Sequence, residues 1–163
     1  MTVAIEDLNQ LSREAFVATL QPLFESADQL AEVLYARRPF GSYAALLETA
    51  EALAFAMPAD QQVTLLSAHP RIGARPETLS AASYREQGYA IQPADTVDAH
   101  LAELNQEYEA RFGFRFVVFV DRRPRAEIVR VLRERLHNTR ETELETGLRA
   151  IFLIARDRLA AAP

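Results

Sequence analysis

Apolar residues recur with the period of an α-helix along most of this chain, and this pattern constrains the fold more than any other feature. One apolar face follows Ser12 and consists of Phe16, Leu20, Leu23 and Phe24. Proline or glycine follows several such segments, as at Pro39, Pro58, Gly88 and Gly113. The chain has 163 residues, 49% of them hydrophobic, which is enough to bury one core without disulfides. The sequence therefore predicts an all-α fold of about seven to eight helices in a single compact domain, residues 1–163.

Local motifs predict where some of these helices begin or bend. The spacing of a capping box occurs in Ser26-Ala-Asp-Gln29 and again in Asn138-Thr-Arg-Glu141, so a helix is expected to start at each. Pro22 lies within the first apolar face. Since proline removes a helical hydrogen bond, we expect it to kink that helix or divide it in two.

The run from Phe112 to Val120 does not follow the helical period. Its aromatic and β-branched residues favour an extended conformation, and no second strand pattern exists to pair with it. We therefore expect one isolated extended segment, at about residues 114–120, buried between helices. Some of its backbone groups then need unusual partners, and a ligand is one candidate.

Composition excludes several classes of function. The chain has no cysteine, and its histidines, at positions 69, 100 and 137, lack the spacing of a paired metal motif, so no metal site is expected. A formal net charge of -5 argues against nucleic acid and acidic membranes as partners. Neither a signal peptide nor a membrane-spanning run is recognisable, which predicts a cytoplasmic protein.

The most distinctive short motif is His69-Pro70-Arg71-Ile72-Gly73, which follows an apolar helical run. Pro70 disfavours helical geometry in the residue before it, so it determines where the His69 imidazole points. One interpretation is a histidine at a helix end that interacts with the last carbonyls. The other is a rigidly held catalytic base, since imidazole titrates near neutral pH.

Ser83, Glu86 and Gln87 lie on one face of a short helix that is predicted to follow Ser80. This face could be a solvated surface. Alternatively, it presents a hydroxyl, a carboxylate and an amide to His69, and a histidine with a glutamate can move a proton at neutral pH. A carboxylated substrate would also need an arginine, and the residues alone do not choose among Arg71, Arg85, Arg156 and Arg158.

Taken in order, several motifs resemble the OHCU decarboxylase family of uric acid degradation. They are His69-Pro70, Ser83-x-x-Glu86-Gln87, Leu104-Asn105-x-x-Tyr108, Phe112-Gly113-Phe114-x-Phe116-Val117-Val118, Arg135-Leu136-x-Asn138 and Arg158-Leu159. The resemblance extends over nearly the whole chain.

The resemblance implies an all-α homodimer without metal or organic cofactor. The implied reaction decarboxylates 2-oxo-4-hydroxy-4-carboxy-5-ureidoimidazoline to (S)-allantoin. Residue by residue, it implies catalytic roles for His69 and Glu86. It implies substrate contacts from Pro70, Ser83, Gln87 and Arg158, and from the backbone of Phe116, Val117 and Val118.

Two features depart from the family pattern. Arg115 stands where the family often has proline, and the loop after Gln87 looks short. Two alternatives therefore stay open: an enzyme of the same fold that acts on a related ureido or imidazoline acid, with Arg115 altering selectivity, and a non-catalytic helical interaction domain. The role of Arg71 is not assigned.

Overall fold

The computed structural model describes residues 3–25, 27–88 and 96–161, and within them all regular structure is helical. The elements are α1 (Ile5–Gln10), α2 (Arg13–Phe24), α3 (Asp28–Tyr35), α4 (Tyr43–Ala56), α5 (Ala59–Ala68), the 3-10 turn η1 (Pro76–Thr78), α6 (Ala81–Glu86), α7 (Thr96–Phe112), α8 (Arg125–Arg135) and α9 (Arg140–Ala161). The all-α prediction is confirmed. The short α1 was not predicted, because six residues are too few to show a helical period.

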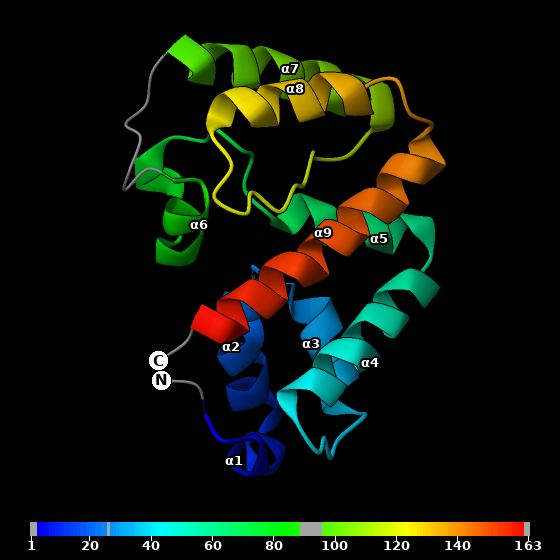
Figure 1. Cartoon of the computed structure of the whole chain (residues 1–163). Helices are drawn as coiled ribbons and strands as arrows, with labels where there is room; N and C mark the ends of the chain where they lie inside the picture. The colour runs from blue at the N-terminus through cyan, green and yellow to red at the C-terminus, as the bar shows by residue number, and fades with distance from the viewer. Residues whose placement is uncertain (1–2, 26, 89–95, 162–163) are drawn as a thin grey trace.

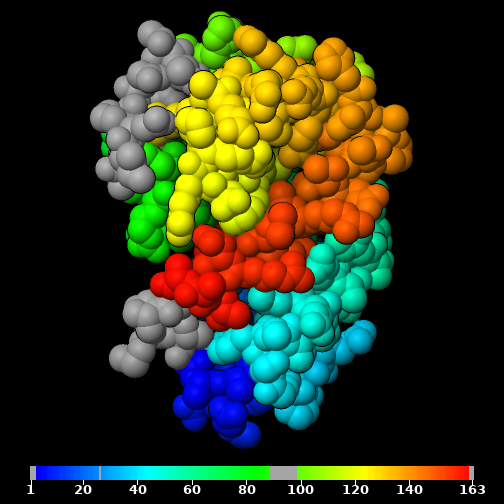
Figure 2. Space-filling view, in the orientation of Figure 1, coloured from blue at the N-terminus to red at the C-terminus, as the bar shows by residue number. Residues whose placement is uncertain are grey.

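Helix α9 holds the fold together. It crosses the molecule diagonally, with α7 and α8 on one side and α1–α4 on the other (Figure 1). It packs against α2, α4 and α5, and its buried face includes Leu148, Ile151, Phe152 and Ala155. At Gly147 a Cβ atom would lie 2.7 Å from Leu66 Cδ2, so glycine permits α9 to approach α5 this closely. Figure 2 shows the red end of α9 between the green and yellow segments and the blue and cyan ones.

The helix starts and bends were predicted with mixed success. The predicted cap at Ser26 lies outside the described residues. The predicted cap at Asn138 is wrong, because Thr139 Oγ1 accepts from the Thr142 amide while Asn138 Nδ2 donates to the Glu143 carboxylate. Pro22 does not divide α2, since it lies in the last turn, two residues before the helix ends.

The segment after α7 is extended, as the sequence predicts, and Phe114, Phe116 and Val117 are buried. Its carbonyls indeed have unusual partners: Arg135 Nη1 donates to Val117 at 2.8 Å, and Arg123 donates to two carbonyls further on. The backbone N–H groups at 116–118 donate to no acceptor within the described part of the chain. Donors without a partner, in residues that are buried or half-buried, are groups that a bound molecule can satisfy.

A second buried cluster supports this segment from behind. Glu143 is fully buried, and its Oε2 accepts from the Tyr108 hydroxyl and from Arg135 Nε at 2.7 Å. Its Oε1 accepts from Asn138 Nδ2 at 2.7 Å. Because Arg135 also bonds the Val117 carbonyl, the cluster ties α7, α8 and α9 to the extended segment. We call Tyr108, Arg135, Asn138 and Glu143 the closed cluster.

None of the described helices combines the length and the apolar composition that crossing a membrane requires.

Candidate active site

One cavity of about 680 Å³ lies between α2, α6, α9, the loop after α5 and the extended segment. It gathers positions that are far apart in the sequence. The lining includes all nine residues to which the resemblance gave a role, namely His69, Pro70, Ser83, Glu86, Gln87, Phe116, Val117, Val118 and Arg158. Their shared placement is a property of the structure, and their individual roles stay predictions.

His69 follows the last residue of α5 in an extended conformation and is 3% exposed. Neither ring nitrogen makes a hydrogen bond of normal geometry to the described residues, although the ring lies near the Leu65 carbonyl of α5, which weakly favours its protonated form. Burial is the main cause that lowers the pKa of His69 from 6.5 to about 4, and the charge of Arg158 adds to it while Glu25 opposes it. At neutral pH the imidazole is therefore neutral and offers one N–H and one lone pair.

Gln87 holds the loop that carries His69. Its Nε2 donates to the Arg71 carbonyl at 3.0 Å, and its Oε1 accepts from the Gly73 amide at 2.9 Å. Gly73 has a φ of 77°, a conformation that glycine adopts without strain. The amide of Gln87 thus adds two hydrogen bonds to an irregular loop that makes one of its own, from the Ala74 amide to the Arg71 carbonyl at 3.1 Å.

Two further side chains hold the same loop, and sequence reasoning gave neither of them this role. Asn105 on α7 donates to the Ile72 carbonyl at 2.9 Å, and Arg115 donates to the His69 carbonyl at 2.7 Å. Arg115 is not among the residues that line the cavity. The family motif contains Asn105, which was the available signal, whereas nothing in the sequence connects Arg115 to His69.

Arg71 contributes its backbone to the site and its side chain to the surface. The guanidinium makes two hydrogen bonds to Glu109, at 2.6 and 2.7 Å, with half of the arginine side chain exposed. Arg71 is also absent from the cavity lining. Its side chain therefore serves as a surface link between the loop and α7.

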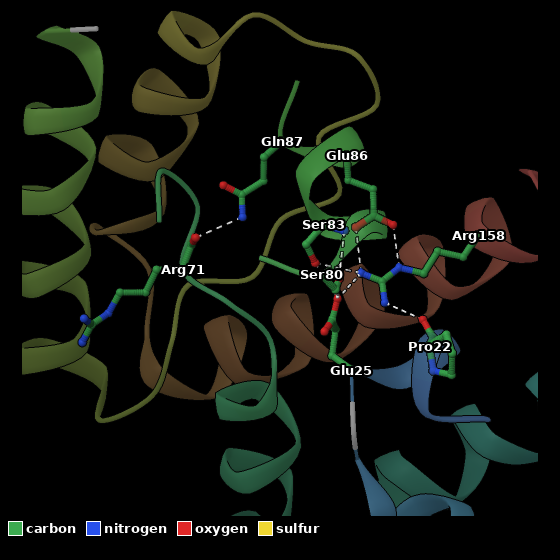
Figure 3. A network of polar contacts seen from close by, with 8 residues as sticks. All are labelled: Pro22, Glu25, Arg71, Ser80, Ser83, Glu86, Gln87 and Arg158. Carbon is green, nitrogen blue, oxygen red and sulfur yellow. Dashed lines mark hydrogen bonds and ion pairs between the residues drawn. The ribbon is translucent and has the colours of Figure 1, made fainter. Parts of the chain in front are cut away.

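Arg158 forms a fork with Glu86 (Figure 3): its Nε donates to Oε1 at 2.5 Å and its Nη2 to Oε2 at 2.8 Å. Nη1 donates to the Pro22 carbonyl at 2.8 Å, and Nη2 also donates to Glu25 at 2.7 Å. Four of the five N–H groups of the guanidinium are therefore engaged. The resemblance implies that Arg158 contacts the substrate; in the structure its fork holds Glu86, and one N–H of the guanidinium has no acceptor among the described residues.

Glu25 is the residue that sequence reasoning missed. It follows α2 in a left-handed conformation, with φ 51° and ψ 55°. Its Oε1 accepts from Arg158 Nη2, from Ser80 Oγ at 2.9 Å and from Ser83 Oγ (Figure 3). Burial by itself would raise the pKa of Glu25, but the Ser83 hydrogen bond and the Arg158 charge outweigh it and lower the pKa. We call Glu25, Ser83, Glu86 and Arg158 the open cluster.

The fold and the cavity define a helical protein with a site suited to proton transfer on a small polar molecule, because a neutral histidine with both nitrogens available shares the cavity with the ion-paired carboxylate of Glu86. The chain belongs to the OHCU decarboxylase family, whose model matches residues 9–160.

Individual relatives match nearly the whole chain. The chain is 35% identical over 159 residues to the uric acid degradation bifunctional protein PucL of Bacillus subtilis, covering 96% of this chain and 32% of that protein. It thus spans about a third of the bifunctional Bacillus proteins that it matches. It is 33% identical to a 2-oxo-4-hydroxy-4-carboxy-5-ureidoimidazoline decarboxylase of Mus musculus, covering 93% of this chain and 88% of the mouse protein.

Two solved structures share the fold. An OHCU decarboxylase crystallised in the presence of (S)-allantoin superposes with a TM-score of 0.72 at 25% identity, covering 92% of this chain and 96% of that one. An (S)-allantoin synthase superposes with a TM-score of 0.71 at 22% identity, covering 98% of this chain and 54% of that one.

Proposed function

We propose that this protein is a carboxy-lyase that converts 2-oxo-4-hydroxy-4-carboxy-5-ureidoimidazoline to (S)-allantoin without a metal or an organic cofactor. The observation that carries the proposal is the buried, neutral His69, whose two ring nitrogens have no partner in the described residues and which shares one cavity with Glu86. A buried polar group without a partner is costly, so such a group in a cavity is a candidate for ligand contact. Membership of the decarboxylase family supports the same reaction.

In the proposed mechanism, the neutral imidazole of His69 accepts the proton of the substrate hydroxyl. Glu86 lines the same cavity, and Arg158 fixes the orientation of its carboxylate. The bond to the carboxylate then breaks, carbon dioxide leaves, and the electron pair of that bond enters the adjoining carbon–nitrogen π system. A proton delivered from one face completes the product and determines its handedness. The backbone N–H groups at 116–118 supply donors for the polar edge of the ring.

The two alternatives have less support. A solvated polar face would leave the face of α6 exposed, yet Ser83 is 2% and Gln87 6% exposed. The idea that Arg115 alters selectivity has less support because Arg115 does not line the cavity and its guanidinium bonds the His69 carbonyl. The decarboxylase of the family's own substrate is therefore the function that we propose.

The test generates the unstable substrate from urate in situ and follows optically active allantoin by circular dichroism. We expect the wild-type protein to accelerate the signal and to yield the S enantiomer. Kinetics identical to the reaction without protein, with racemic product, would refute the proposal.

We further propose that the protein acts in the cytoplasm as a homodimer, as the family resemblance implies. Light scattering of the purified protein tests the second point: a mass of one chain, about 18.3 kDa, at the concentrations used for the activity assay would contradict it.

A further inference from the structure

The hydroxyl of Ser83 lies between two ions of opposite sign. Ser83 lines the cavity from α6 and is 2% exposed. Its Oγ is within hydrogen-bonding distance of Glu25 Oε1 on one side and lies 3.2 Å from Arg158 Nη2 on the other (Figure 3). The direction of the hydroxyl hydrogen follows from these two neighbours.

A guanidinium has no lone pair to accept a hydrogen bond, and an ionised carboxylate has no hydrogen to donate. Ser83 therefore donates its only hydrogen to Glu25, and it receives only a shared, longer contact from Arg158 Nη2, whose two hydrogens point to Glu25 and Glu86. A hydroxyl oxygen has two lone pairs, so one remains. With its hydrogen donated to Glu25, the Ser83 hydroxyl can only accept a hydrogen bond from a bound molecule.

Glu25 is well placed to enforce this direction. It is not among the residues that line the cavity, so it acts from behind the wall. Ser80 Oγ and Arg158 Nη2 also donate to the same oxygen, at 2.9 and 2.7 Å, which holds the carboxylate in place. Hydrogen bonds to an ionised partner are about twice as strong as neutral ones, so rotating the Ser83 hydrogen toward the cavity would sacrifice a strong bond.

We propose that Glu25 is a positioning residue that fixes Ser83 as a hydrogen-bond acceptor, so that this point of the cavity selects an N–H or O–H donor of the ligand and disfavours a carboxylate. The inference rests on the proposed function, because it assigns to Ser83 a donor of that substrate, such as a ureido N–H. The carboxylate must then find its donors elsewhere. Among the lining residues, the donors without an acceptor in the described chain include the backbone N–H groups at 116–118 and one N–H of Arg158.

The experiment measures binding of (S)-allantoin, which carries ureido N–H donors, by isothermal titration calorimetry. Losing one hydrogen bond in S83A should weaken binding about 2- to 10-fold. E25A frees the hydroxyl to rotate and should produce a similar loss. In the double variant E25A/S83A the two effects should not add, since both remove the same acceptor.

E25Q is the matched control. Its amide oxygen can accept from Ser83, Ser80 and Arg158 as Glu25 Oε1 does, while its charge is gone. E25Q should therefore keep binding within about twofold of the wild type. If E25Q loses as much affinity as E25A, the charge of Glu25 matters rather than the direction it imposes on Ser83, and the inference fails.

The remaining outcomes are also decisive. Unchanged binding in a folded S83A overturns the inference while leaving the proposed function intact. Additive losses in the double variant overturn the role of Glu25. If E25A does not fold, S83T replaces it: threonine retains the hydroxyl and should restore the affinity that S83A loses, and failure to do so contradicts the acceptor role. No binding to the wild type, together with no turnover, would refute the proposed function and this assignment with it.

Discussion

The closed cluster and the open cluster each contain a glutamate paired with an arginine, but the closed cluster supports the fold whereas the open cluster borders the cavity. In the closed cluster Arg135 pairs with Glu143, whose side chain is 0% exposed. In the open cluster Arg158 pairs with Glu86 and Glu25, whose side chains are 20% and 15% exposed. One cluster is bonded to the backbone of the extended segment through Arg135, and the other contributes Ser83, Glu86 and Arg158 to the cavity wall.

The two regions differ in whether their buried polar atoms all have hydrogen-bond partners. Both carboxylate oxygens of Glu143 receive donors from the protein, and Arg135 additionally bonds the Val117 carbonyl. Next to the open cluster, by contrast, both nitrogens of His69 lack a partner among the described residues. A fully satisfied buried network makes the fold unique, whereas an unsatisfied buried group is destabilising and is retained where function requires it. This contrast predicts which variants lose activity and which lose stability.

The largest effect is expected for H69A. Removing a positioned acid or base typically lowers turnover about 10²–10⁴-fold, while the fold should persist because no protein hydrogen bond of the ring is lost. Turnover is followed by circular dichroism of allantoin, and folding by far-ultraviolet circular dichroism. The matched control is H137A, an exposed histidine after α8, which should keep full activity. Wild-type turnover in a folded H69A would contradict the prediction that His69 is needed for activity rather than for stability.

The next effect concerns the closed cluster. E143Q leaves the buried guanidinium of Arg135 without its counter-charge, and breaking a buried ion pair in this way costs about 3–5 kcal/mol of the free energy of unfolding. Urea titration measures it. R149M serves as the control, because it removes an exposed pair with Glu145 on one turn of α9 that should be worth about 0.3–0.5 kcal/mol. If both variants lose equally little, the closed cluster does not carry the stability that we assign to it.

These two regions also show what a sequence can and cannot predict here. The helical faces and the extended run are local patterns, so both were predictable, and the nine site residues followed from a recognisable family motif. Glu25 lies 58 residues from Ser83 and belongs to no local motif, so only the packed structure brings them together. The choice of Thr139 over Asn138 as a cap is likewise decided by a tertiary contact, since Glu143 takes the Asn138 side chain.

The third effect is a pH dependence of stability that comes from His69. Its pKa is about 4 in the folded protein and 6.5 when exposed, so the unfolded chain binds more protons between these values. Stability from this group is fully present above pH 6.5 and falls as the pH drops toward 4, by about 3 kcal/mol in all, at 1.36 kcal/mol for each pH unit of the shift. Urea titrations at pH 7, 5.5 and 4 test this.

H69A is also the control for this measurement. Without the imidazole, that part of the pH dependence should disappear, while the contributions of the carboxylates remain. Identical pH dependence in wild type and H69A would show that His69 is not held neutral by burial, and the proposed base would lose its physical basis.

The smallest effect is expected for the Arg71 side chain, and we compare its loss with the loss of Gln87, which bonds the Arg71 backbone. R71A removes an ion pair whose arginine is half exposed, and such pairs contribute about 0–1 kcal/mol, so stability and turnover should change little. Q87A instead removes both hydrogen bonds of this amide: the half-buried Gly73 amide loses its acceptor, at about 1–3 kcal/mol, whereas the Arg71 carbonyl still accepts from the Ala74 amide at 3.1 Å. Since those bonds aim the loop that carries His69, Q87A should lower kcat more than R71A does. Equal kcat values in the two variants would mean that the loop keeps its conformation without Gln87 and would contradict the positioning role that we give to this amide.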